Sequence, residues 1–318
     1  MSVTMPPPPS VSAAPPDPRP VASVVVCTHR RPELLDACLG SLVGQRASGG
    51  AHEILVVDNS PGMEARPVVE RWQPAFAMRG VPLRYRLEER SGVAFARNRG
   101  VAEAAGALIA FIDDDERACE NWLERLLEPF ERLGDAVDLV AGEVEPDFGD
   151  QPRPDWLGDD LLHFFSCRWG WDSASRFLQD HEWFGEGNCA FRKRLLADRG
   201  FPTDFGRKGD GLMSNEGVVF LELRAAGAAT YYVPEAMVFH RIHPDRLSRR
   251  WLMRRMFYQG ASDRLAQRRH GIAEQRWDFN VNLAKLADLD VESLEGESLR
   301  AVIRLYFQFG YAAAPGMY

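Results

Sequence analysis

Residues 107–116, ALIAFIDDDE, join an apolar run to three consecutive aspartates. The run is short and predicts a buried strand that ends where the aspartates begin, at Asp113. Three neighbouring carboxylates repel one another, and a hard divalent cation with oxygen ligands is the usual partner of such a group at the end of a strand. Mg²⁺ or Mn²⁺ held there would keep positions open for phosphate oxygens. The alternative is a solvated acidic turn that caps a helix beginning near Asn121.

The composition is that of an ordinary globular protein. The chain has 318 residues, of which 45% are hydrophobic and 26% charged, so it is long enough for one large domain or two modest ones. Its formal net charge of −8 argues against a general nucleic-acid-binding protein, because such proteins present a basic surface. No run reaches the roughly 18 to 20 apolar residues that cross a bilayer. Residues 1–20 are rich in proline, and we expect a disordered tail there rather than a signal peptide.

The five cysteines are scattered along the chain and form no CxxC pair or other short regular spacing. Their positions therefore predict neither a zinc site nor a disulfide framework. We expect a reduced, cytoplasmic setting for the protein. The five are Cys27, Cys38, Cys119, Cys167 and Cys189.

Strands alternate with helical segments over about 110 residues after the tail. This alternation predicts an α/β fold with a Rossmann-like, doubly wound, mostly parallel sheet flanked by helices. Ligands of such sheets bind beyond the carboxyl ends of the strands. The expected strands are 21–27, 53–58, 82–89 and 107–112, and the expected helices are 33–43, 63–78 and 96–105.

Polar residues gather at the carboxyl ends of three of these strands. A single polar residue there would serve as a helix cap, whereas three sets at one edge of the sheet predict a ligand site. The sets are Thr28, His29 and Arg30 after the first strand, Asp58 and Asn59 after the second, and Asp113, Asp114 and Asp115 after the fourth.

The middle of the chain changes character. Further strands are expected at 138–144, after a helix at about 120–132, and at 230–242. Between them, residues 146–185 hold half of the chain's eight tryptophans, and these aromatic side chains either fill a satellite core or form an acceptor-binding surface. Residues 185–201 predict a glycine-rich approach followed by a short helix.

Arginines are concentrated near the C-terminus. Residues 241–276 contain ten arginines and three acidic residues, a pattern that is usually a solvated helix face but also supplies cations to phosphate or to an anionic membrane surface. Residues 299–314 then form an apolar helix that carries Arg300 and Arg304. We expect this helix to pack against the protein or against a second copy in a homodimer, with contact to a membrane surface as the alternative.

In this order and at these intervals, the motifs resemble the glycosyltransferase family 2 enzymes of the GT-A fold over about residues 21–260. The motifs are VVVCTHRR, EILVVDNSP, SGVAFARNRG, AFIDDDE, EGNCAFRKRLL, the segment around Glu216, and VPEAMVFHR with the arginine-rich helix after it. The family transfers a sugar from a nucleotide diphosphate donor to an acceptor, usually with inversion and usually with Mn²⁺ or Mg²⁺. The implied domains are a GT-A domain at 21–245, divided into a nucleotide-binding half at 21–145 and an acceptor half at 146–245, and a C-terminal helical extension at 246–318.

The resemblance also implies roles for individual residues. Asp58 would contact the nucleotide base, Asp113 the ribose, and Asp115 the metal ion that bridges the diphosphate. Arg97 would help to hold the nucleotide. His240 would complete the metal or diphosphate site, with a buried, hydrogen-bonded histidine as the alternative. The remaining candidates are Thr28, Arg30 and Asp114 for the nucleotide sugar, and Trp183, Gly187 and Asn188 for the acceptor.

One position departs from the family pattern. Family members commonly have Glu-Asp at the start of the late helix, with the aspartate as the base, whereas this chain has Glu216 followed by Gly217. We expect Glu216 to take the proton of the acceptor, with a helix-capping role as the alternative. An acidic residue that the family often has near Val219 is also missing.

These observations predict a metal-dependent inverting glycosyltransferase with a nucleotide diphosphate sugar as donor, UDP being favoured as the carrier through the resemblance alone. The metal ion would stabilise the charge that builds on the leaving diphosphate. The missing aspartate at position 217 supports a non-catalytic nucleotide-sugar-binding protein as the alternative. A nucleotidyltransferase is disfavoured because no glycine-rich phosphate loop follows the first strand. The acceptor stays open among saccharides, lipid-linked intermediates and small natural products.

Overall fold

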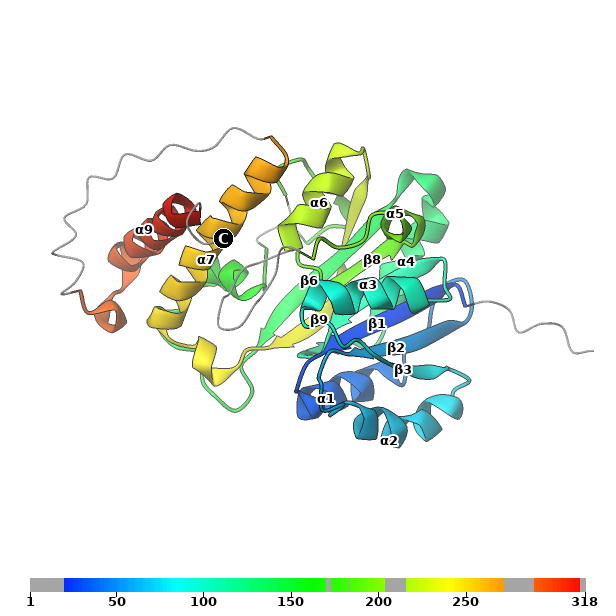
Figure 1. The fold of residues 1–318 in the computed structure, drawn as a ribbon. Coiled ribbons are helices and arrows are strands. Elements are labelled where there is room, and N and C mark those ends of the chain that lie inside the picture. The colour runs from blue at the N-terminus through cyan, green and yellow to red at the C-terminus, as the bar shows by residue number, and fades with distance from the viewer. Residues whose placement is uncertain (1–19, 170–172, 183, 204–215, 272–288, 315–318) are drawn as a thin grey trace, which may run out of the picture.

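The computed structural model describes residues 20–169, 173–182, 184–203, 216–271 and 289–314. Within these residues, the strands form one nine-stranded sheet. Eight of them follow the order β3-β2-β1-β4-β8-β6-β9-β5, and the ninth, β7, pairs with β9 outside this order. Helices cover the sheet, and two long helices, α7 and α9, lie beside it on the side away from β3 (Figure 1). The α/β fold predicted from the sequence, with a sheet flanked by helices, is confirmed.

The N-terminal half of the sheet is parallel. β1 (Ala22–Thr28) lies between β2 (His52–Asp58) and β4 (Leu108–Asp113), and β2 pairs with β3 (Leu83–Leu87). These strands begin and end within two residues of the predicted ranges. Because all four run in the same direction, the segments that follow them emerge at one edge of the sheet.

Both faces of this parallel half are buried, which explains the continuous apolar runs of its strands. Val24 faces α1 (Pro32–Leu42) and α2 (Arg66–Ala77), whereas its neighbour Val25 belongs to the core under α3 (Val93–Glu103). Successive side chains of a strand point to opposite faces, so each strand contributes to two cores. The helices thereby fix the sheet from both sides.

The second half of the sheet mixes directions. β8 (Asn188–Arg192) runs antiparallel between β4 and β6 (Leu139–Asp147), and β9 (Thr230–Arg241) is parallel to β6. The prediction of a glycine-rich approach and a short helix at 185–201 is therefore incomplete. The segment contains strand β8 before the short helix, because its short run NCAFR is completed by neighbours on both sides rather than by its own pattern.

The remaining elements connect these layers. α4 covers the face that also carries α1, and α6 packs on the α3 side through Val219 and Phe220. The elements are β5 (Glu116–Ala118), α4 (Trp122–Arg132), η1 (Gly134–Ala136), η2 (Asp159–Phe165), β7 (Arg176–Phe177), α5 (Arg194–Ala197), α6 (Glu216–Ala225), η3 (Pro244–Arg246) and η4 (Val291–Ser293).

The C-terminal helices α7 (Arg249–Arg269) and α9 (Gly296–Ala313) pack closely against each other. A Cβ atom at Gly310 would overlap the backbone carbonyl oxygen of Phe257, and one at Gly260 would overlap that of Phe307. The expectation that 299–314 packs on the protein is thus confirmed. None of the described helices is long and apolar enough to cross a membrane.

The Gly310→Ala substitution should therefore destabilise the protein, although alanine favours a helix more than glycine does. The added methyl group forces the two helix backbones apart, and we expect a net loss of about 1–3 kcal/mol in the free energy of unfolding. Gly44→Ala is the matched control, since a Cβ there meets nothing within 4 Å. Urea unfolding of both variants measures the difference. Equal stability of the two variants would contradict the close helix contact.

Candidate functional site

A pocket of about 580 Å³ opens at the edge of the sheet where β1, β2 and β4 end. The polar segments after these strands line it, together with Gly185, Glu186 and Gly187 before β8. Three cationic or imidazole side chains from the C-terminal side complete the wall, namely His240, Arg246 and Arg255. No described Phe, Tyr or Trp side chain lines this pocket. Most of the residues that line it are polar or charged.

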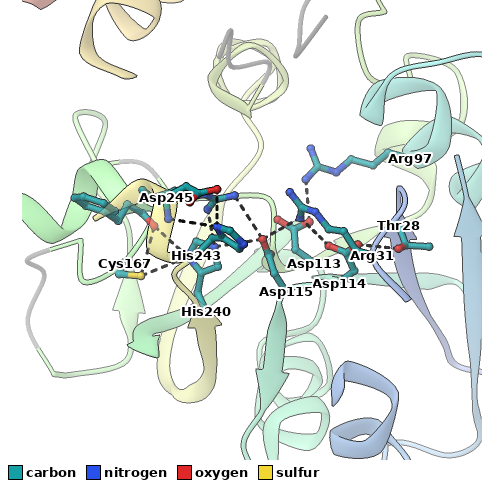
Figure 2. A network of polar contacts seen from close by, with 12 residues as sticks. Thr28, Arg31, Arg97, Asp113, Asp114, Asp115, Cys167, His240, His243 and Asp245 are labelled. Atoms are coloured by element: carbon teal, nitrogen blue, oxygen red, sulfur yellow. Dashed lines mark hydrogen bonds and ion pairs between the residues drawn. The ribbon is translucent and has the colours of Figure 1, made fainter. Parts of the chain in front are cut away.

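Protein cations and a hydroxyl hold the aspartates together at the turn between β4 and β5 (Figure 2). The Thr28 hydroxyl donates to Asp114 Oδ2 over 2.7 Å. Arg31 Nη1 lies 3.1 Å from Asp114 Oδ1 and 3.0 Å from Asp115 Oδ2, so one guanidinium bridges both carboxylates. From the sequence we expected a bound cation to supply the compensating positive charge, and Arg31 was not predicted to do so. Its position directly after Arg30 in the CTHRR segment was the available signal.

The pKa values of the two bridged carboxyl groups, Asp114 and Asp115, are shifted in opposite directions. Burial, together with the charge of Asp115, raises the pKa of Asp114 to about 7. Burial also acts to raise the pKa of Asp115, but His240 in its protonated form, Arg246 and Arg31 outweigh it and hold that pKa well below the usual value. Asp115 is therefore the carboxylate that stays ionised, as a cation ligand must.

His240 reaches the aspartates through the antiparallel pairing of β5 with β9, which sets it opposite Glu116. Its Nδ1 lies 3.0 Å from the backbone oxygen of Phe165, which can only accept a hydrogen bond. Nδ1 consequently carries a proton. Nε2 lies 3.7 Å from Asp115 Oδ2 and offers its lone pair to a cation when the imidazole is neutral. Arg246 Nη1 lies 3.3 Å from that Nε2.

The Asp115 carboxylate and the His240 Nε2 lone pair fit a divalent cation such as Mn²⁺. The Nδ1–H contact to a backbone carbonyl is the arrangement that commonly orients a metal-binding imidazole. Among the described residues, no group of three His, Cys, Asp or Glu side chains is placed to hold a metal ion. An ion bound here would therefore rely on further oxygen ligands, which a diphosphate supplies.

Asp58 does not line the pocket. Its carboxylate is 0% exposed and accepts hydrogen bonds from the backbone N–H groups of Ser60 and Ala65 and from the Tyr85 hydroxyl. It therefore organises the loop after β2, and its contact with a nucleotide base stays a prediction. The next residue, Asn59, does line the pocket, as Arg30 does.

The structure separates the three acceptor candidates. Gly187 lines the pocket, and a Cβ atom there would lie 2.9 Å from Asp113 Oδ2. Asn188 is 1% exposed and is absent from the pocket wall, because its oxygen accepts from Trp122 Nε1 and its Nδ2 donates to two backbone carbonyls. Asn188 is thus a buried link between α4, β6 and β9, and its contact with an acceptor stays a prediction. Trp183 lies outside the described residues.

Glu216 and the aromatic cluster are the remaining candidates from the middle of the chain. Glu216 begins α6, but its side chain lies outside the described part of the chain, so its role as a base stays a prediction. Of the aromatic cluster at 146–185, Phe165 stacks on Trp251 and Phe184 packs on Phe220 in the core. The core interpretation is confirmed for these two side chains.

The family model described as glycosyl transferase family 2 matches residues 23–201. The chain belongs to this family. The succinoglycan biosynthesis protein ExoM of Rhizobium meliloti is 29% identical over 265 residues, which cover 82% of this chain and 80% of that protein. A glucosyl-dolichyl phosphate glucuronosyltransferase of Haloferax volcanii is 27% identical over 314 residues, with coverage of 92% and 93%.

Two solved structures share the fold. The mannosyltransferase PcManGT from Pyrobaculum calidifontis, in complex with GDP-Man and Mn²⁺, matches with a TM-score of 0.55 and 20% identity, over 98% of this chain and 79% of that one. S. aureus TarS 1-349 in complex with UDP matches with a TM-score of 0.53 and 14% identity, over 93% and 92%. The fold is GT-A, and the protein is a family 2 glycosyltransferase that uses a nucleotide-sugar donor.

Asn188→Ala tests whether this residue serves as a buried structural link. The substitution leaves the Trp122 indole N–H and the carbonyl groups of Glu143 and Ala236 without these hydrogen bonds. We expect the free energy of unfolding to fall by about 2–4 kcal/mol, because each buried group that loses its partner is costly. Thermal and urea unfolding of the ligand-free protein measure this. Unchanged stability would contradict the structural role.

Proposed function

We propose that this glycosyltransferase depends on a divalent metal ion, takes its sugar from a UDP donor and transfers it with inversion. The observation that carries the metal proposal is the juxtaposition of the ionised Asp115 carboxylate and the Nε2 lone pair of His240 at the pocket wall. UDP is proposed from the family resemblance and from the UDP complex of TarS, although the PcManGT structure holds a guanosine nucleotide.

The pocket provides the charges that a diphosphate needs. Arg30, Arg31 and Arg246 line it, and guanidinium groups form strong hydrogen bonds with phosphate oxygens. Asp115 and His240 would hold the metal ion, which when bound stabilises the negative charge of the leaving diphosphate. In the described arrangement, Arg31 and Arg246 both pair with the Asp115 carboxylate. When a cation and a diphosphate bind, Asp115 would pair with the cation and the two arginines with the diphosphate.

Inversion requires a base on the face of the sugar opposite the leaving group. We propose Glu216 for this role, because it stands at the start of α6 where the family carries its Glu-Asp pair. A positioned base typically contributes about 10²- to 10⁴-fold to the rate. Membership of the family favours this enzymatic function over the non-catalytic alternative that the glycine at position 217 had suggested.

A saccharide acceptor, free or lipid-linked, is the proposal that the relatives support. The name of one relative refers to succinoglycan, and that of another to a glucosyl-dolichyl phosphate, and both align over at least four fifths of this chain. We also propose a cytoplasmic location. The five cysteines are all free, which fits a reducing compartment.

Thermal unfolding with UDP and MnCl₂, together and separately, tests the donor site. A ligand at 100 times its dissociation constant stabilises the native state by about 2.7 kcal/mol, so the melting temperature should rise by about 5 °C in the presence of both. Asp115→Asn should abolish the Mn²⁺-dependent part of this shift. Asp147→Asn is the matched control, because that carboxylate also faces two arginines but lies outside the pocket wall.

Three other outcomes would revise the proposal. If GDP or dTDP raises the melting temperature and UDP does not, the proposed UDP donor is wrong and the nucleotide that raises it takes its place. A UDP shift that persists undiminished in EDTA would contradict metal dependence and assign the diphosphate to the arginines. No shift with any of the three nucleotides would remove the donor site from this pocket.

A further inference from the structure

Arg97 lies at the floor of the pocket with only 3% of its side chain exposed. Its Nη1 contacts the carboxylate of Glu186, and its Nη2 lies 3.3 Å from Asp113 Oδ1. Figure 2 shows the guanidinium directed at Asp113 from the α3 side. Both terminal nitrogens of this guanidinium, Nη1 and Nη2, thus contact protein carboxylates.

Glu186 is 0% exposed and belongs to the segment that leads into β8. A buried carboxylate is tolerated when a cation pairs with it, and breaking such a pair leaves a costly uncompensated charge. Arg97 supplies this cation, and its guanidinium also lies 5.7 Å from the centre of the Phe201 ring. Arg97 therefore cannot turn toward a ligand without leaving the charge of Glu186 buried.

Asp113 differs from this buried pair. Its side chain is 37% exposed and lines the pocket, while its backbone N–H donates to Glu116 Oε2 over 3.1 Å. The backbone at Gly187, in the segment that leads into β8, lies next to Asp113. A Cβ atom at Gly187 would lie 2.9 Å from Asp113 Oδ2. Asp113 is therefore the member of this group that can touch a ligand.

We propose that Arg97 and Glu186 form a buried brace that orients the Asp113 carboxylate toward the donor. Arg97 then acts on the donor through Asp113 and not by direct contact with the nucleotide. Both members of the brace are positioning residues. The inference rests on the proposed function, in which Asp113 accepts a hydrogen bond from a ribose hydroxyl.

The two roles for Arg97 predict opposite responses to conservative substitutions. If Arg97 contacted the diphosphate directly, Glu186→Gln would leave the positive charge of Arg97 less compensated and would strengthen anion binding. Arg97→Lys would keep much of the attraction between residue 97 and the diphosphate. If Arg97 is half of a brace, both variants weaken donor binding. Lysine is a point charge without the planar fork, and cannot span two carboxylates in the same way.

Isothermal titration with Mn²⁺ and UDP, 2′-deoxy-UDP or 3′-deoxy-UDP separates these roles. The unmodified protein should prefer UDP over one of the deoxy analogues by about tenfold, the usual effect of a hydrogen bond to a charged group. Glu186→Gln and Arg97→Lys should each weaken UDP binding by about tenfold and bring that preference close to one. A general loss of structure would weaken all three ligands alike. The ratio compares ligands on one variant, so it does not depend on the fraction that is folded.

Glu182→Gln is the matched control, because Glu182 also pairs with an arginine, Arg176, over 2.7 and 2.6 Å, but lies outside the pocket wall. It should bind UDP as the unmodified protein does. Equal or tighter UDP binding by Glu186→Gln, or an intact UDP preference in Arg97→Lys, would overturn the brace while leaving the donor site in place. Failure of the unmodified protein to bind UDP, GDP or dTDP would overturn the proposed function, and the brace with it.

Discussion

Repulsion between adjacent carboxylates is the constraint on which the site depends. Three consecutive aspartates begin at the last residue of β4, and each of them has its own set of partners. Arg97 faces Asp113, Thr28 and Arg31 hold Asp114, and Arg31, Arg246 and His240 surround Asp115. Because burial then acts on carboxylates with unequal partners, the pKa of Asp114 rises while that of Asp115 falls. A single turn thus presents carboxylates with distinct properties.

The sheet topology brings those partners together. The parallel order of β3, β2, β1 and β4 places Thr28 and Arg31 beside the aspartate turn. The antiparallel pairing of β5 with β9 then carries His240 to the same edge from more than a hundred residues further along the chain. The short connection from β9 into α7 adds Arg246. The pocket is therefore built from segments that lie far apart in the sequence.

Local pattern was sufficient to predict the parallel strands and the polar residues at their ends. It also indicated the aspartate turn and His240, because these belong to motifs of recognisable order. Partners across the fold were not accessible in the same way. The sequence predicts Asp58 and Asn188 as ligand residues, but it does not show the hydrogen bonds that both make inside the protein. Glu186 was missed because only the folded chain sets it against Arg97, 89 residues away.

Anomalous diffraction at the manganese edge, from crystals of the protein grown with UDP and Mn²⁺, locates the metal ion directly. We expect one strong anomalous peak in the pocket, within coordination distance of the Asp115 carboxylate and of Nε2 of His240. A peak on other residues, or no peak in crystals whose pocket contains UDP, would contradict the assignment of this pair as the protein's metal ligands.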